Sequence, residues 1–168
     1  MIATRKENDE VLYVKETTVT VAAPDLVELR RLASLNPRRR IRLCTHQTAG
    51  DHVHEMIIYH PKGAYVRPHK HVGKEESFHL VYGEVDLVLF DESGGVVRVV
   101  GIGDYTSGKP YYYKIPAGSY HTQLFRKDTV FHEVTKGPFN PRDTVFAKWG
   151  PAEQDVSLVN DYVAELVP

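Results

Sequence analysis

The chain has 168 residues, of which 42% are hydrophobic and 26% charged, with a formal net charge of -1. This fits one globular domain and gives no basic excess for nucleic acid or an anionic membrane. The single cysteine, Cys44, excludes an internal disulfide and a multi-cysteine zinc site. No run approaches the roughly 20 apolar residues of a membrane span, and the N-terminus lacks a signal peptide. We therefore expect a cytoplasmic protein with no nucleic-acid or membrane partner.

The first predicted elements precede the main β-rich region. Residues 1–10 are polar and aperiodic, which indicates a mobile tail, and residues 11–21 are rich in β-branched types, which predicts a strand. Pro24 can occupy the first helical position of a helix that ends before Asn36-Pro37, the only helix that the pattern predicts. We expect an N-terminal tail and extra strand over 1–22 and a single domain over 23–168.

Beyond Pro37 the sequence changes to short β-type runs separated by turn residues, a pattern typical of an all-β sandwich or barrel. The runs predict strands at 53–60, 64–69, 77–82, 84–91, 96–100, 111–115, 120–126 and 130–136. Residues 91–95, Asp-Glu-Ser-Gly-Gly, predict a hairpin loop. Residues 137–151 are predicted to cross the barrel as irregular chain.

The spacing of several histidines predicts a metal-binding site. Alternate residues of a strand share a face, so His69 and His71 can reach one ion. The turn at 72–74 is expected to bring the next strand alongside, where Glu76 adds an oxygen, and His121 follows a Pro-Gly turn. Three imidazoles and one carboxylate suit a single divalent ion such as zinc, nickel, iron(II) or manganese(II). Glu75 is the rival carboxylate, but one step along a strand reverses its face.

Strand parity also predicts the ligand pocket. Tyr65 and Arg67 share a face with His69 and His71, and Gln123 lies one inward step beyond His121. We predict that Arg67 binds an anionic or polyhydroxylated small molecule, with Tyr65 and Gln123 as supporting contacts. The alternatives are an Arg67 paired with an inner carboxylate and a buried Gln123 amide bonded to backbone.

Other side chains receive simpler predictions. Phe78, Leu80 and Tyr82 are expected on the inner face. The run from Arg38 to Arg42 could hold phosphates or form a solvated loop. The histidines without matching spacing are expected at the surface or packed in the core: His46, His52, His54, His60, His79 and His132.

The spacing of His69, His71, Glu76 and Gly83, followed by Pro116, Gly118 and His121, resembles the paired motifs of the cupin superfamily. The second motif departs at Pro110, where glycine is expected, and lacks an Asn after His121. More narrowly, residues 26–153 resemble the WbuC-type cupin fold metalloproteins. The motifs that carry this likeness are Asn36-Pro37-Arg38-Arg39-Arg40, His46, Ala64-Tyr65-Val66-Arg67-Pro68-His69-Lys70-His71, Glu76-Ser77-Phe78, Leu89-Phe90-Asp91, Ile115-Pro116-Ala117-Gly118, Gly137-Pro138-Phe139 and Trp149-Gly150-Pro151-Ala152-Glu153.

The resemblance implies an all-β, cupin-type jelly-roll β-barrel, here with one N-terminal helix and an N-terminal strand extension. It implies a metal held at the positions of His69, His71, Glu76 and His121. It also implies an association with bacterial surface-polysaccharide gene clusters, but no particular substrate.

We expect a metal-dependent enzyme of isomerase or epimerase type acting on a small sugar or sugar nucleotide, in which Glu76 moves a proton. The alternatives are an iron-dependent dioxygenase and a non-catalytic, metal-stabilised ligand-binding module. We also predict a homodimer, because the extra strand at 11–21 would otherwise leave an open sheet edge.

Overall fold

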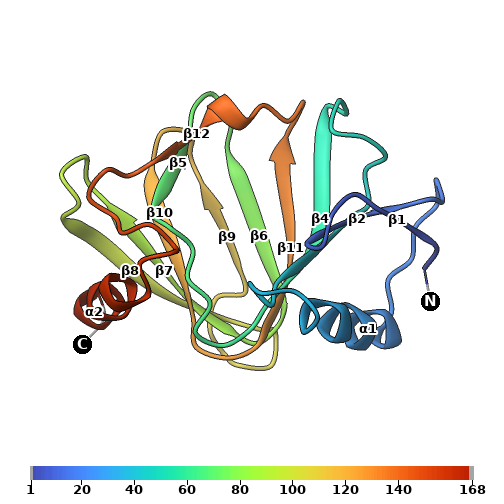
Figure 1. Ribbon diagram of the computed structural model, residues 1–168, viewed down its shortest axis with the longest axis horizontal. Helices are drawn as coiled ribbons and strands as arrows, with labels where there is room; N and C mark the ends of the chain where they lie inside the picture. The colour runs from blue at the N-terminus through green and yellow to red at the C-terminus, as the bar shows by residue number, and fades with distance from the viewer. Residues whose placement is uncertain (1, 167–168) are drawn as a thin grey trace.

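Two β-sheets face each other in the computed structural model, which describes residues 2–166 (Figure 1). The larger sheet has the order β1-β2-β3-β4-β11-β6-β9, and the smaller sheet has the order β12-β5-β10-β7-β8. Neighbouring strands are antiparallel except for the parallel pair β2 and β3. The strands are β1 (Thr4–Lys6), β2 (Val11–Val14), β3 (Ile41–Cys44), β4 (Val53–His60), β5 (His69–His71), β6 (Glu76–Tyr82), β7 (Glu84–Phe90), β8 (Val96–Gly103), β9 (Tyr112–Ile115), β10 (Tyr120–Phe125), β11 (Thr129–Lys136) and β12 (Thr144–Phe146).

The core lies between the two sheets. Alternate residues of each strand point inward, as Phe78 and Leu80 do from β6 and Val85 and Leu87 do from β7. These side chains form one cluster with others of the same faces, such as Phe131 of β11. The two packed sheets confirm the predicted all-β class.

The N-terminal segment is more ordered than predicted. The mobile tail expected over 1–10 is wrong, because Thr4–Lys6 forms β1 and pairs with β2. The strand expected over 11–21 ends at Val14, since its partner β3 ends at Cys44 and offers nothing further to pair with. Because β2 pairs with β3 inside the same chain, the open-edge argument for a homodimer no longer holds.

Helix α1 (Ala23–Ala33) confirms the predicted helix, and Pro24 lies in its first turn. The backbone N–H of Ala22 donates to the Asp25 carboxylate at 2.9 Å, which caps this end. Leu29 and Ala33 are buried against the far strands of the larger sheet. Leu29 and Ala33 therefore hold the helix against β3 and β4. Figure 1 shows α1 on the same side of the molecule as the N-terminal strands β1 and β2.

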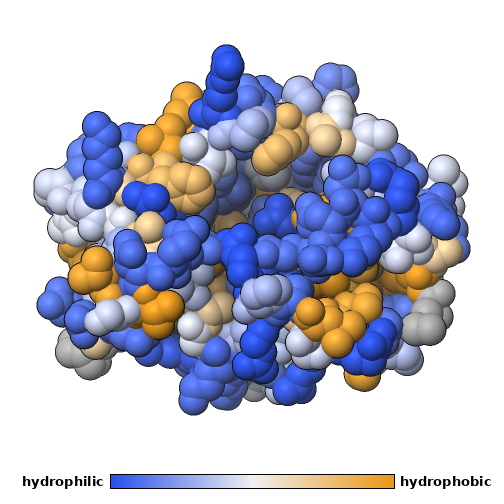
Figure 2. Space-filling model, viewed as in Figure 1, coloured by the Kyte–Doolittle hydropathy of each residue, from blue (hydrophilic) through white to orange (hydrophobic). Residues whose placement is uncertain are grey.

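A second helix, α2 (Val156–Leu166), overturns the expectation of a single helix. Its apolar residues lie three or four apart, at Val159, Tyr162, Val163 and Leu166. Tyr162, Val163 and Leu166 pack together with Val88 and other side chains of the smaller sheet. No helix within residues 2–166 is long and apolar enough to cross a membrane. On the face shown in Figure 2, hydrophilic side chains predominate and hydrophobic ones lie in separate groups.

Several strand predictions need correction. The strand expected at 64–69 is wrong, because only an isolated bridge joins Tyr65 to Leu124 and Pro68 lacks the N–H that a ladder needs. β3 and β12 were not predicted, and β12 pairs with β5 inside the segment expected to be irregular. Tyr82 is exposed rather than inward, because a bulge opposite Val130 shifts the register at the end of β6.

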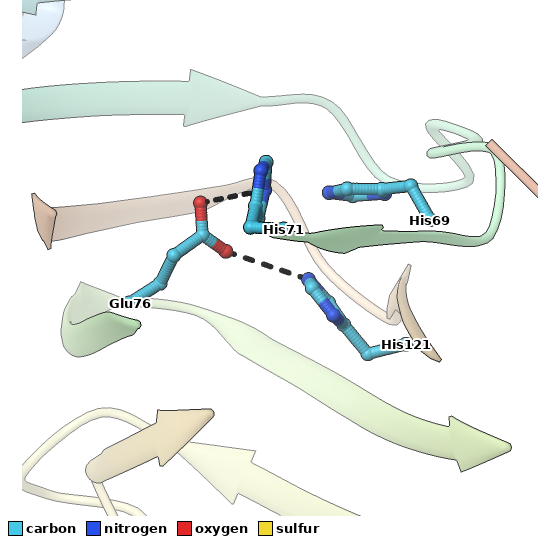
Figure 3. Close-up of side chains that lie close together, drawn as sticks. All are labelled: His69, His71, Glu76 and His121. Carbon is cyan, nitrogen blue, oxygen red and sulfur yellow. Dashed lines mark ion pairs between the residues drawn. The ribbon is translucent and has the colours of Figure 1, made fainter. Parts of the chain in front are cut away.

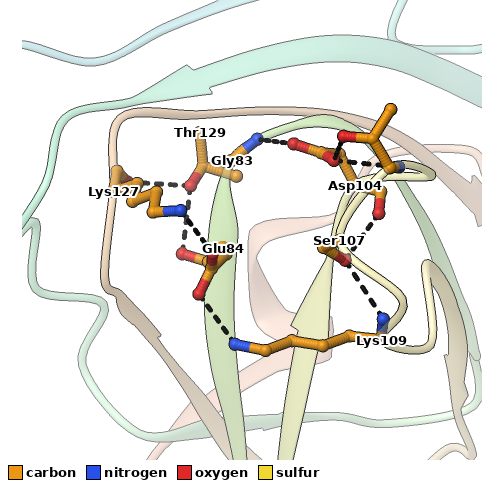
Figure 4. A network of polar contacts seen from close by, with 8 residues as sticks. Gly83, Glu84, Asp104, Ser107, Lys109, Lys127 and Thr129 are labelled. Carbon is orange, nitrogen blue, oxygen red and sulfur yellow. Dashed lines mark hydrogen bonds and ion pairs between the residues drawn. The ribbon is translucent and has the colours of Figure 1, made fainter.

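The end of the barrel near Glu84 is closed by a polar network (Figure 4). The Glu84 carboxylate binds Lys109 Nζ at 2.7 Å and also pairs with Lys127. The backbone N–H of Gly83 donates to Asp104 at 3.1 Å. In the β7–β10 ladder, Val85 pairs with Phe125 at one end while Leu89 pairs with His121 towards the other. The network therefore fastens loops at the end away from the histidines.

Gly83 has no room for a side chain. Its φ is +100°, and a β-carbon there would overlap the carbonyl oxygen of Asp128. We expect Gly83→Ala to lower the free energy of unfolding by about 3 kcal/mol. Gly108→Ala is the control, because its φ is +73° but the space around it is open, and we expect a loss of about 1 kcal/mol. Urea denaturation of both variants tests this, and equal losses would contradict the role of Asp128.

Candidate metal centre

Three strands bring the four predicted ligand residues together (Figure 3). His69 and His71 come from β5, and His121 of β10 lies directly opposite His69 in the ladder. Glu76 begins β6, which belongs to the other sheet. The prediction that the turn at 72–74 lays β6 alongside β5 is therefore wrong. The turn crosses between the sheets, and Glu76 faces the histidines across the barrel.

The donor atoms of the four side chains lie within 4.8 Å of one another. His71 Nε2 is 2.9 Å from Glu76 Oε1, and His121 Nε2 is 3.5 Å from Glu76 Oε2 (Figure 3). Bonds of about 2.1 Å to one ion separate neighbouring donors by roughly 3 to 4 Å. Small side-chain movements therefore suffice to close these four residues on a single ion.

Hydrogen bonds orient each imidazole. His69 Nδ1 lies 2.9 Å from the carbonyl oxygen of Arg67, and His121 Nδ1 lies 3.0 Å from that of Ser119. A carbonyl only accepts, so these Nδ1 atoms carry the proton and each Nε2 keeps a lone pair. His71 Nδ1 is fixed by the Thr144 hydroxyl at 3.2 Å. The Nε2 atoms of His69 and His121 are thus available as ligands, and the Nε2 atom of His71 points towards Glu76.

Glu76 supplies an independent sign that the cluster suits a cation. Its Oε2 is buried and has no hydrogen-bond partner among residues 2–166. A buried carboxylate oxygen beside an imidazole lone pair is unfavourable unless a positive charge lies between them. The donor set, its orientation and this orphaned oxygen all fit a divalent ion.

The charge states also suit a metal. Burial, followed by the neighbouring His121, lowers the pKa of His69 to about 4. Burial alone would raise the pKa of Glu76, but the adjacent His121 and His71 imidazoles outweigh it and hold that pKa well below its usual range. At neutral pH His69 is therefore neutral and Glu76 ionised, as metal ligation requires.

The predicted pocket residues lie close to the cluster but bind other groups. Arg67 Nη2 donates to the carbonyl of Ala147 at 2.9 Å, and its guanidinium lies 5.4 Å from the Phe146 ring. Arg67 Nε is buried without a partner among the described residues. The Tyr65 hydroxyl donates to the carbonyl of Pro151 at 3.0 Å. No inner carboxylate pairs with Arg67 in the described chain, so that alternative for Arg67 is not supported.

Gln123 is buried on β10. Its Nε2 donates to the Tyr113 hydroxyl at 2.5 Å, so its partner is a side chain rather than the backbone that the alternative expected. The ligand-binding roles of Tyr65, Arg67 and Gln123 remain predictions.

The other histidines lie away from the cluster. His46 stacks on His54 at 4.1 Å, and His60 stacks on Phe125 at 4.4 Å. These are packed residues, as expected. The exposed His79 lies 5.4 Å from the Tyr111 ring, pointing away from the ion site. In the run from Arg38 to Arg42, Arg38 and Arg40 form ion pairs with Glu10 and Glu153. These ion pairs fit the interpretation as a loop better than the interpretation as a phosphate site.

Glu133 is a further inward residue that the sequence analysis missed. It pairs in register with Met56 of β4 and Phe78 of β6, both core residues. Burial, and next the charge of Glu76, raise the pKa of the Glu133 carboxyl to about 8. Glu133 lies two residues after Phe131 in the predicted strand 130–136. Strand alternation therefore places it on the same face as Phe131, which is the signal that identifies it as inward.

Comparisons with known proteins support the fold. A family model described as a domain of unknown function (DUF6016) matches residues 21–102, just under half of the chain. No curated protein matches this chain. A solved protein from Shewanella oneidensis is 12% identical with a TM-score of 0.55, and the match covers 88% of this chain and 96% of that one.

Two further solved structures are similar. An uncharacterised protein with a double-stranded β-helix domain from Klebsiella pneumoniae is 13% identical with a TM-score of 0.50, over 65% of this chain and 80% of that one. Capsular polysaccharide assembling protein CapF from Staphylococcus aureus is 21% identical with a TM-score of 0.47, over 58% of this chain and 27% of that one. The match covers only about half or less of several of the solved chains. It covers 51% of one of them and 27% of the CapF chain.

Taken together, the two sheets and their structural relatives define a cupin-like double-stranded β-helix protein. Its barrel carries a His69, His71, Glu76 and His121 group that could hold a metal ion.

Proposed function

We propose that this protein is a metal-dependent enzyme that acts on a small, anionic, oxygen-rich substrate such as a sugar acid or sugar nucleotide. The reaction class is isomerisation or epimerisation. The observation that carries the proposal is the inward cluster of three oriented Nε2 atoms with the orphaned Glu76 Oε2. A divalent ion there would polarise a substrate carbonyl as a Lewis acid.

The residues around the cluster support an anionic substrate. Phe146 pairs with His69 in the ladder, and the rings of these two residues are 6.1 Å apart. Arg67 lies against the same Phe146 ring and keeps an unpartnered Nε. Arg67 thus holds a positive charge beside the ion site, where it can orient a carboxylate or phosphate.

We further propose that the chain is a WbuC-type cupin with a role in surface-polysaccharide metabolism. The support is the sequence resemblance over residues 26–153, including the motif from Ala64 to His71.

Metal content tests the proposed function. We expect about one divalent ion per chain in protein purified without chelator, and a loss of at least about tenfold in His71→Ala and His121→Ala. His79→Ala is the matched control, because His79 is an exposed histidine on β6, and it should keep its metal. Elemental analysis gives the answer. Equal metal content in all four proteins would reject the metal site.

Arg67→Met tests the anion contact. We expect the metal-loaded variant to lose about tenfold in affinity for glucuronate, because a charge-assisted hydrogen bond is removed, while metal content and melting temperature stay unchanged. Isothermal titration calorimetry measures the affinity, with the exposed Arg98→Met as control. A joint fall in melting temperature and metal content would instead give Arg67 a structural role through Ala147.

A further inference from the structure

Glu133 is an acidic residue whose side chain is directed into the barrel. Its cross-strand neighbours on both sides, Met56 and Phe78, are only 4% and 3% exposed and belong to the main core cluster. Directly opposite residues of a sheet share a face, so Glu133 points to the same interior. A carboxyl in such surroundings is costly to the fold, and a purely structural site would favour an apolar residue.

No partner compensates for this carboxyl. Within residues 2–166, Glu133 forms no ion pair and no side-chain hydrogen bond. The Glu133 side chain is half-buried rather than sealed in the core, so it keeps some access to solvent. Glu133 is therefore an inward carboxyl with free hydrogen-bonding capacity.

The surroundings place Glu133 beside the candidate metal centre. The charged groups that act on it are Glu76 of β6, Arg42 of β3 and Lys74 of the turn that leads into β6. Phe78, the partner of Glu133 on β6, lies two residues beyond Glu76 on the same face, so Glu133 and Glu76 are diagonal neighbours across the pair of strands β11 and β6. Tyr113 of β9 pairs with Phe78 from the other side. A molecule bound to an ion at Glu76 would therefore lie on the face of the sheet to which Glu133 points.

We propose that Glu133 is a catalytic acid of this pocket, which donates a hydrogen bond, and during turnover its proton, to a metal-bound substrate. The inference rests on the proposed function. In the transfer the O–H bond of Glu133 breaks and the proton bonds to the substrate atom that carries the developing negative charge. The proton that the substrate carbon loses is released to water, and the Glu133 carboxylate regains a proton from water, so the isomerisation is balanced. This assignment leaves Glu76 to hold the ion, so proton transfer does not compete with ligation.

Oxalate is a suitable probe, because it chelates a bound divalent ion and presents only acceptor oxygens. We expect zinc-loaded Glu133→Met, which removes the donor at similar volume, to bind oxalate about tenfold more weakly than the wild type. Glu133→Gln keeps a donor and should stay within about threefold. Glu55→Gln is the control, since Glu55 lies exposed on neighbouring β4. Calorimetry at pH 7 gives the affinities, and elemental analysis of the same samples gives their zinc content.

The outcomes separate the two proposals. Wild-type protein that takes up no zinc rejects the proposed function. Zinc-loaded wild type that fails to bind oxalate, or a Glu133→Met variant that binds it as tightly as the wild type, overturns the role of Glu133 alone. Equal losses in the Met and Gln variants, together with lowered melting temperatures, would also overturn it, because only a structural role predicts that pattern.

Discussion

Zinc at about 100 times its dissociation constant is expected to raise the free energy of unfolding by about 2.7 kcal/mol. The reason is that β5, β6 and β10 bring the four ligand residues within reach of one another only in the folded chain, so the unfolded chain binds the ion weakly. The ion also neutralises the buried Glu76 carboxylate. Urea denaturation with zinc and with a chelator measures the difference.

The matched variants locate the effect. His121→Ala should lose most of the increment, and the exposed His79→Ala should keep it. Stabilisation that persists in His121→Ala would show that zinc binds elsewhere.

Acid should remove stability even without metal. The pKa of His69 is about 4 in the folded protein and 6.5 for an ordinary histidine, so the unfolded chain takes up this proton first. The stability of the metal-free protein therefore falls as the pH drops from about 6.5 towards 4.

The metal ligands could be found from the sequence because their geometry is local. His69 and His71 share a face by strand alternation alone, and Glu76 follows within one turn. The crossing of that turn between sheets was not predictable, since it depends on the pairing of β5 with β10 and β12.

The features of the site that the sequence does not predict depend on contacts between residues far apart in the chain. Arg67 is bound to Ala147, and Glu133 is inward between β4 and β6, which no short motif records. Helix α2 is different, because the spacing of its apolar residues is a local pattern that predicts a helix without any distant contact.

Replacing Glu133 with glutamine is expected to stabilise the metal-free protein by about 2 kcal/mol at pH 8 and to change little at pH 4. The pKa of this carboxyl is about 8 in the folded protein and near 4.5 when unfolded. Between these values the unfolded chain releases the proton and the folded chain keeps it, so wild-type stability falls as pH rises. Each unit of pKa difference between the folded and unfolded states corresponds to about 1.4 kcal/mol of stability. The expected stabilisation is set below the full value because Glu133 is only partly buried and solvent screens its charge.

Urea denaturation across this pH range, with the exposed Glu55→Gln as control, measures the difference. A Glu133→Gln variant that is less stable than the wild type at pH 8 would mean that Arg42 and Lys74 hold the ionised carboxylate favourably, and would contradict the raised pKa. With zinc bound, the gain should shrink, because the ion cancels the charge of Glu76 that acts on Glu133. The Glu133 carboxyl is expected to lower the free energy of unfolding at neutral pH, and it faces the ion site. Functional sites commonly retain residues that destabilise the fold, and Glu133 fits that pattern.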